Sequence, residues 1–253
     1  MNKKKTAMVG AIATIGIATA FFMTNDLFYF QKIKLERISK RIFYYAQDQV
    51  AQVTEWEKTD VFQIPIPFHP QEHALTCETA ALRMALNYYG ENVTEDELLE
   101  KLSFSTRGPK TNDNIWGDPD LGFVGNIDGS VFKGTGYGVY EEPIKNLAVE
   151  YRTSFIVEKA DLSEILEKVK SGHPVIVWGL LSRRKPIVWK TGEGKIIEAQ
   201  PGEHARVVAG FYGTVSNPTK IILMDPIYGK IRMSKEKFLS DWKVMKNRAV
   251  AVH

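Results

Sequence analysis

Apolar residues follow a helical period most clearly between Ala80 and Tyr89, where they cover most of the circumference of a helix. A helix that is apolar on nearly every side is buried. Gly90 follows directly, and glycine suits the left-handed backbone that ends a helix. The pattern therefore predicts a buried central helix that opens at Cys77, after the proline-rich segment 64–70.

After this helix the chain changes towards strand-length apolar segments. The capping-box pair Thr94 and Glu97 predicts a short helix that ends near Leu102, and Asp161 is placed to cap a helix over 162–170. Further helices are predicted at 141–149 and 234–242, and strands at 154–157, 175–180, 187–189, 195–198, 204–212, 220–225, 230–233 and 248–252. Helices that lead and strands that follow indicate the α+β class, an antiparallel sheet packed on a helical part.

Residues 107–138 show neither the helical period nor the alternation of a strand. Gly, Asn, Asp and Pro dominate, and Trp116, Phe123 and Phe132 are interspersed. A long aperiodic segment is usually functional or disordered, and these aromatic residues argue against disorder. We expect an ordered loop along one side of a groove. Its aspartates lack the spacing of a calcium loop, so they are read as turn residues and not as metal ligands.

The N-terminal residues have the pattern of an export signal. Three lysines at 3–5 precede an apolar run over 6–23. Small residues at 18–20 offer a cleavage site, but the apolar residues at 21–23 prolong the run past it. A cleaved signal peptide and an uncleaved membrane anchor both remain open for 1–26. Either places the rest of the chain outside the cytoplasm, on the cell membrane or secreted, because the lysines stay inside.

Residues 27–58 predict a long amphipathic helix with a basic first half. Apolar residues recur there at three- and four-residue steps, namely Leu35, Ile38, Ile42, Ala46, Val50 and Val53. Two interpretations are open: a stalk lying against an anionic membrane surface, or a helix packed on the domain with a solvated basic face. The chain is thus divided into an export segment at 1–26, a helical linker at 27–59 and a domain at 60–253.

Composition excludes some functions. The chain has 253 residues, a net charge of +3 and the 25% of charged residues that is ordinary for a globular protein. No dense basic stripe with interleaved aromatic residues is present, so nucleic acid is not an expected partner. Cys77 is the single cysteine and cannot form an internal disulfide, which makes it unusual in an exported protein.

Cys77 opens the central helix, where free N–H groups and the positive end of the helix dipole favour a thiolate. A thiol nucleophile needs a base. His204 begins a predicted strand directly after Pro201-Gly202-Glu203, where a side chain can project into a cleft at the sheet's end. The other histidines have no comparable position: His69, His73, His173 and His253.

An orienting carboxylate is predicted at Asp225, which ends the next strand. If Tyr212 pairs with Asn217, His204 lies opposite Asp225; a loop two residues longer moves Asp225 opposite Arg206. In both registers the carboxylate is within reach of an imidazole at position 204. It can then fix the tautomer and support the imidazolium.

An oxyanion donor is predicted at Gln71, on the loop that leads into the helix, where its amide could act together with the Cys77 N–H. Each residue alone has an ordinary structural interpretation, since a lone buried cysteine is usually a small core residue and Asp-Pro is usually a turn. The order Gln, Cys, His, Asp together favours catalysis.

These four residues resemble the papain-like cysteine peptidases. More narrowly, they are similar to the peptidases that process bacteriocin leaders at a double glycine, and to their stand-alone relatives on bacterial cell surfaces. The segments 116–119 and 122–125 are also similar, and the likeness spans 61–252. It implies a papain-like fold and no metal or organic cofactor. It also implies roles for Cys77 as nucleophile, His204 as base, Asp225 as orienter and Gln71 as oxyanion donor.

The sequence therefore predicts an exported or membrane-anchored cysteine peptidase that hydrolyses peptide or protein substrates. Leader peptidases that serve exporters are cytoplasmic and fused to transporter segments, which we do not expect here, so the double-glycine substrate is not carried over. Two alternatives stay open. The same thiol could perform acyl transfer or cleave wall peptides, or the fold could serve as a surface binding module without turnover.

Overall fold

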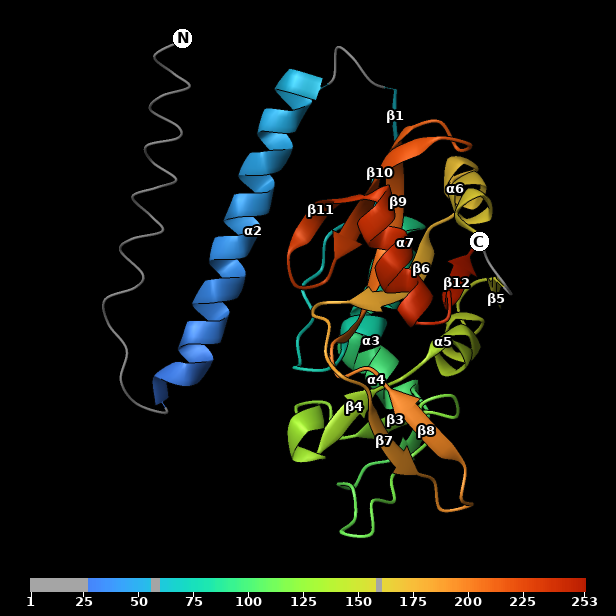
Figure 1. Cartoon of the computed structure of the whole chain (residues 1–253). Helices are drawn as coiled ribbons and strands as arrows, with labels where there is room; N and C mark the ends of the chain where they lie inside the picture. The colour runs from blue at the N-terminus through green and yellow to red at the C-terminus, as the bar shows by residue number, and fades with distance from the viewer. Residues whose placement is uncertain (1–26, 56–59, 158–160) are drawn as a thin grey trace.

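The computed structural model describes residues 27–55, 60–157 and 161–253, the first range with side chains at 34–50 (Figure 1). A seven-stranded sheet forms the body, in the order β11-β10-β9-β6-β12-β5, with β1 also paired to β9. Every pairing in it is antiparallel. The strands are β1 (Val61–Gln63), β5 (Ser154–Ile156), β6 (Val175–Leu180), β9 (Glu203–Gly213), β10 (Pro218–Asp225), β11 (Gly229–Ser234) and β12 (Ala249–Val252).

The central helix is α3 (Cys77–Tyr88), and its residues from Ala80 to Leu82 are fully buried. It ends as predicted, because Gly90 has φ of +88°. The other helices are α4 (Glu95–Lys101), α5 (Glu141–Ala148), α6 (Leu162–Lys170) and α7 (Lys235–Val244). The predicted caps of α4 and α6 are both formed. The α+β class with a buried central helix is confirmed.

Helices α3 and α7 cover opposite faces of the sheet, because side chains alternate along β9. Arg206 faces α7, since a Cβ on Gly179 would lie 3.2 Å from its guanidinium and 3.9 Å from Asp241 of α7. Glu203 is three residues before Arg206 on β9, so its side chain lies on the opposite face of the sheet. It meets Glu78 of α3, since a Cβ on Gly138 would touch the carboxylates of both. The two ends, the start of β9 and the start of α3, therefore meet.

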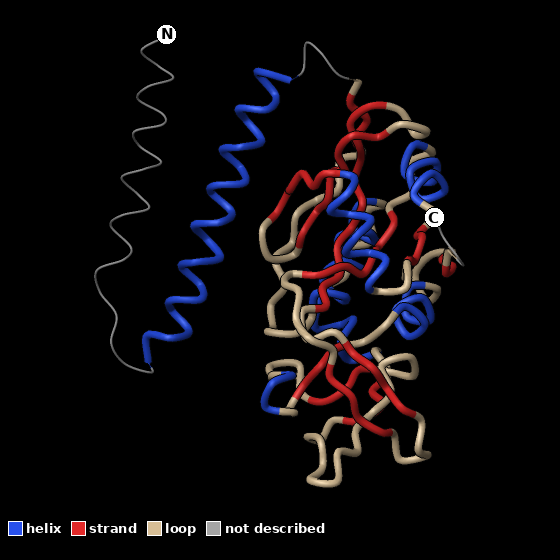
Figure 2. The backbone as a smooth tube through the Cα atoms, in the orientation of Figure 1, coloured by secondary structure: helices blue, strands red, loops and turns tan. Residues whose placement is uncertain are grey.

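Two small sheets form the lower part of the molecule (Figure 2). The predicted hairpin is confirmed as β7 (Ile187–Lys190) and β8 (Ile196–Ala199). The segment 107–138 is ordered, and Trp116 packs on Trp189 with ring centroids 5.2 Å apart. It also holds strands that the sequence pattern did not predict. They are β3 (Phe123–Gly125) and β4 (Gly136–Gly138), which join β2 (Phe104–Thr106). A short 3-10 helix at Val131–Lys133 lies between β3 and β4 in the chain.

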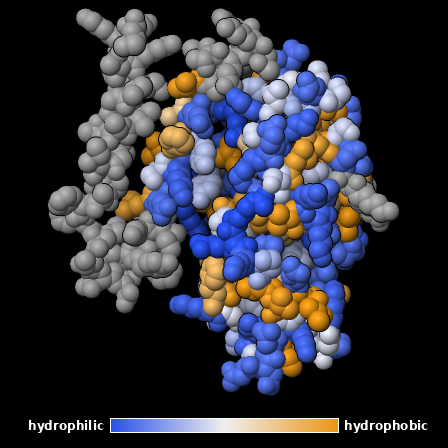
Figure 3. Space-filling model, viewed as in Figure 1, coloured by the Kyte–Doolittle hydropathy of each residue, from blue (hydrophilic) through white to orange (hydrophobic). Residues whose placement is uncertain are grey.

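This lower part carries exposed apolar side chains. Figure 3 shows hydrophobic residues gathered over it, and Leu121, Phe132 and Ile196 are each more than half exposed. The upper part of the visible face is mainly hydrophilic.

Helix α2 (Leu27–Glu55) packs on β11. Asp48 pairs with Lys230 at 2.9 Å and with Arg232 at 2.5 Å, and the ring of Tyr44 lies 5.6 Å from that of Tyr228. The periodic apolar residues Leu35, Ile38, Ile42 and Val50 are exposed instead. The helix therefore docks through a polar and aromatic face, which its apolar period did not indicate.

Within the described ranges, no helix is both long and apolar enough to cross a membrane. The signal or anchor predicted for 1–26 lies outside the described residues. The division into 27–59 and 60–253 stays a prediction.

Candidate active site

Cys77 is the first residue of α3 and is 6% exposed. Its Sγ–H donates to Oε2 of Glu78 at 3.2 Å, and its sulfur accepts the backbone N–H of Ala205 at 3.4 Å. Ala205 follows His204 on β9, so the sulfur lies beside the strand that carries the predicted base. Among the described residues, these two groups are the hydrogen-bond partners of the sulfur.

His204 and Asp225 meet as predicted. His204 Nε2 lies 3.1 Å from Oδ2 of Asp225, and Arg206 Nε donates to the same oxygen at 2.7 Å. Met224 pairs with Val207, so continuing this register places Asp225 opposite Arg206, the second of the two predicted registers. A register shift between Ile222 and Leu223 produces it. His204 and Asp225 are 1% and 0% exposed, so the pair is shielded from water.

The tautomer of His204 follows from its partner. Burial raises the pKa of Asp225, but the nearby His204 and Arg206 outweigh this effect and the pKa falls below its ordinary value. The carboxylate is therefore ionised, and its Oδ1 accepts the backbone N–H groups of Ile227 and Tyr228 at 2.7 and 2.9 Å. An ionised carboxylate only accepts, so Nε2 of His204 carries the proton and Nδ1 is the basic atom. Burial also lowers the pKa of His204, which keeps the ring neutral near pH 7.

Two carboxylates that the sequence analysis missed surround the sulfur. Glu78 is buried, and its Oε1 accepts the Val139 N–H at 2.8 Å. Glu203 has a buried Oε1 without a hydrogen-bond partner in the described part of the chain. Donor atoms of Cys77, Glu78 and Glu203 all lie within 4.8 Å of one another, close enough to share a metal ion. The available signal was a glutamate directly beside Cys77 and another directly beside His204.

These carboxylates oppose the predicted thiolate. Burial, then the charges of Glu78 and Glu203, raise the pKa of the Cys77 thiol well above its ordinary value. Burial likewise raises the pKa of Glu78 to about 7, and burial together with the Glu78 charge raises that of Glu203 well above the usual range. The Ala205 N–H and the helix terminus act in the opposite direction but are outweighed. The direction of this shift opposes the thiolate that the sequence predicts and favours a neutral thiol at Cys77.

Gln71 lies beside the site, because its backbone N–H donates to Pro226 O, the residue after Asp225, at 3.0 Å. Its side-chain Nε2 donates to the carbonyls of His73 and Ala74 at 2.8 and 3.0 Å. Both N–H groups of its side chain are thus used within its own loop. Three of the other histidines have separate partners: His73 pairs with Asp128 at 3.0 Å, and His173 stacks on His253.

Residues 63–250 match the model of the Peptidase_C39 like family. The chain belongs to this family. It is 31% identical over 185 residues to the uncharacterized protein YvpB of Bacillus subtilis (strain 168), covering 70% of this chain and 68% of that one.

A solved structure agrees on the fold. A C39-like peptidase from Bacillus anthracis superposes with a TM-score of 0.65 at 27% identity, over 77% of this chain and 98% of that chain. The peptidase domain of Streptococcus ComA, a bifunctional ABC transporter of a quorum-sensing pathway, matches with a TM-score of 0.43 at 21% identity, over 74% and 98%. The predicted family and the papain-like peptidase fold are confirmed. The family match begins at residue 63, so α2 lies outside it.

Proposed function

We propose that the chain is a cysteine peptidase that hydrolyses peptide bonds through Cys77, His204 and Asp225, with Gln71 as an oxyanion donor. The observation that carries the proposal is that His204 lies 3.1 Å from Asp225 while the Cys77 sulfur accepts the backbone N–H of Ala205, the residue after His204, at 3.4 Å. Membership of a peptidase family supports the class of reaction.

In the proposed reaction His204 Nδ1 takes the thiol proton, and the sulfur attacks the substrate carbonyl carbon. The oxyanion is held by the Cys77 N–H at the start of α3 and by the Gln71 amide. The C–N bond then breaks, the amine leaves with the proton from His204, and water attacks the thioester with His204 again as base. Asp225 orients the ring throughout.

The resting geometry requires two local changes before the attack. A rotation about the Cα–Cβ bond of Cys77 must carry the sulfur from Glu78 towards the imidazole. The Gln71 amide must release one of the two loop carbonyls that it now binds at 2.8 and 3.0 Å. Catalytic hydrogen bonds often tighten only when substrate is bound.

A neutral, buried thiol also supports the second candidate function, a binding module without turnover. The two are separated by incubating the full-length chain, in detergent, with a pool of bacterial surface peptides and searching for new termini by mass spectrometry. We expect new termini with the wild type and none with Cys77→Ala or His204→Ala. Their absence with the wild type would favour the binding module, and new amide bonds would indicate acyl transfer.

We propose further that the domain is exported, supported by the lysines at 3–5 and the apolar run that follows. A fusion of alkaline phosphatase after residue 253 should be active in a bacterial host, because this enzyme folds only outside the cytoplasm. An inactive but abundant fusion would contradict export.

A further inference from the structure

A cavity of about 640 Å³ lies between α2 and the loop that carries Gln71. Its α2 wall is formed by Lys34, Arg37, Ile38 and Arg41, and its other wall by Pro70, Gln71, Glu72, His73, Ala74 and Asp128. Because Gln71 belongs to the second wall, the cavity reaches the proposed oxyanion site. Its α2 wall lies outside the matched family region, so this chain adds it to the family's domain.

The two walls differ in how their charges are balanced. On the loop wall, Glu72 pairs with Arg83 at 2.6 Å. Asp128 pairs with His73 at 3.0 Å and accepts the Ala74 N–H at 3.1 Å. These carboxylates are therefore already occupied on their own side of the cavity.

On the α2 wall the cations form no ion pairs among the residues that the structure describes. Neither Lys34 nor Arg37 forms an ion pair with any residue that the structure describes. Arg41 donates to the carbonyl of Ile227 at 2.5 Å and lies over the Phe68 ring at 5.2 Å. It forms no ion pair in the described part of the chain, and the carboxylate that attracts it, the buried Asp225, is already paired with Arg206. The cavity thus has an excess of positive charge along one side, opposite the wall that carries the proposed oxyanion donor Gln71.

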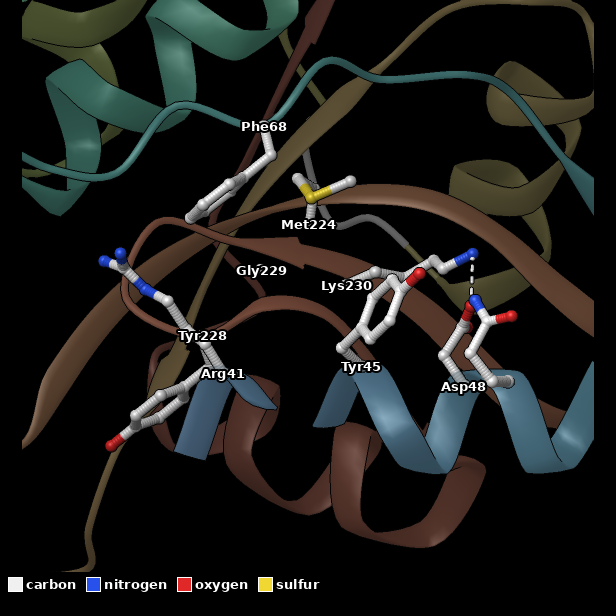
Figure 4. A pocket seen from close by; sticks show the side chains of 9 residues that line it. Arg41, Tyr45, Asp48, Phe68, Met224, Tyr228, Gly229 and Lys230 are labelled. Carbon is white, nitrogen blue, oxygen red and sulfur yellow. Dashed lines mark ion pairs between the residues drawn. The ribbon is translucent and has the colours of Figure 1, made fainter. Parts of the chain in front are cut away.

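Contacts further along α2 hold this wall in place. Figure 4 shows Asp48 of α2 paired with Lys230, while Arg41 points from the same helix towards Phe68. Asp48 also pairs with Arg232 at 2.5 Å. These contacts hold the α2 wall against the domain, and they keep its cations in fixed positions along the helix.

We propose that this cavity is a substrate subsite that selects acidic peptides, with substrate carboxylates paired to Lys34, Arg37 and Arg41. The inference rests on the proposed peptidase function and names its substrate class. Arg37 and Arg41 are four residues apart, which is about 6 Å along a helix axis. Alternate side chains of an extended peptide repeat at about 6.6 Å. The subsite therefore fits acidic residues at alternate positions, a few residues from the scissile bond.

Binding is tested on the full-length Cys77→Ala chain, so that no turnover is required. The probes are a short fluorescein-labelled peptide with glutamate at alternate positions and its glutamine counterpart, compared by fluorescence anisotropy. We expect the acidic peptide to bind about tenfold more tightly, as a few partly exposed ion pairs allow, and the difference to shrink with added salt. Arg37→Glu should abolish the preference.

Lys40→Gln is the matched control, because Lys40 is on the same helix but does not line the cavity and pairs with Glu36 at 3.2 Å. It should keep the preference. Equal binding of the two peptides, or a preference that Arg37→Glu leaves unchanged, would overturn the subsite. If the acidic peptide binds selectively but the wild-type chain never cleaves it or any other peptide, the subsite stands and the peptidase proposal fails.

Discussion

The strongest electrostatic prediction concerns the two buried carboxylates beside Cys77. Replacing both, as Glu78→Gln/Glu203→Gln, removes the negative charge that opposes the thiolate while keeping the side-chain shapes. All three groups lie within 4.8 Å of one another. A unit charge at that distance contributes about 3.5 kcal/mol at an effective dielectric constant of about 20, or about 2.5 pKa units. Solvent relaxation reduces this, so we expect the thiol pKa to fall by about one to two units.

The assay is the rate of alkylation by iodoacetamide as a function of pH, with the modified residue identified by mass spectrometry. The midpoint of the profile should move to lower pH in the double variant. Each single variant should move it less, because the remaining carboxylate keeps the charge that the pair shares. Glu91→Gln, just beyond the other end of α3, is the control and should leave the midpoint unchanged. An unchanged midpoint in the double variant would refute the reasoning.

Three further predictions concern stability and turnover. Because the pKa of Glu78 is raised to about 7, the stability it contributes is present below the ordinary glutamate pKa and is lost as pH rises through about 7. Urea unfolding of the double variant should lack this loss, and an equal dependence of unfolding free energy on pH in the variant and the wild type would contradict it. Asp225→Asn should lower kcat/KM by about 10²–10⁴-fold, and near-wild-type kinetics would reject the orienting role. It should also lower the free energy of unfolding by about 3–5 kcal/mol, because Arg206 loses its buried carboxylate partner. Gly138→Ala should destabilise the fold by about 1–3 kcal/mol, because φ is +143° and the new Cβ would lie 2.6 Å from Glu78. Gly192→Ala is the control, since a Cβ there meets open space and should leave stability unchanged. Equal unfolding midpoints for the two variants would be inconsistent with this packing.

Features that depend on local pattern were predictable from the sequence. The central helix, its glycine stop, the capping box at Thr94 and the β7–β8 hairpin each follow from a few adjacent residues. The His204–Asp225 pair was also within reach, because consecutive antiparallel strands limit the possible registers to a few. The register itself was not decided, since it depends on a bulge between Ile222 and Leu223.

Features that depend on distant contacts were not predictable. Glu78 and Glu203 are far apart in the chain and meet only because β9 begins where α3 begins. Strands β3 and β4 have three residues each and contain glycine, so they are too short to show a period. Helix α2 docks through Asp48 and Tyr44, while its apolar stripe stays exposed, the reverse of what an amphipathic pattern indicates.

The central claim, that Cys77 carries the acyl group during peptide hydrolysis, is tested most directly by trapping the intermediate. The full-length chain is turned over on an activated peptide thioester, quenched in acid and analysed by intact and fragment mass spectrometry. The account predicts an added acyl mass located on Cys77 in the wild type, and none in Cys77→Ala or His204→Ala. Product formation with the acyl mass on another residue, or undiminished product formation by either variant, would contradict it.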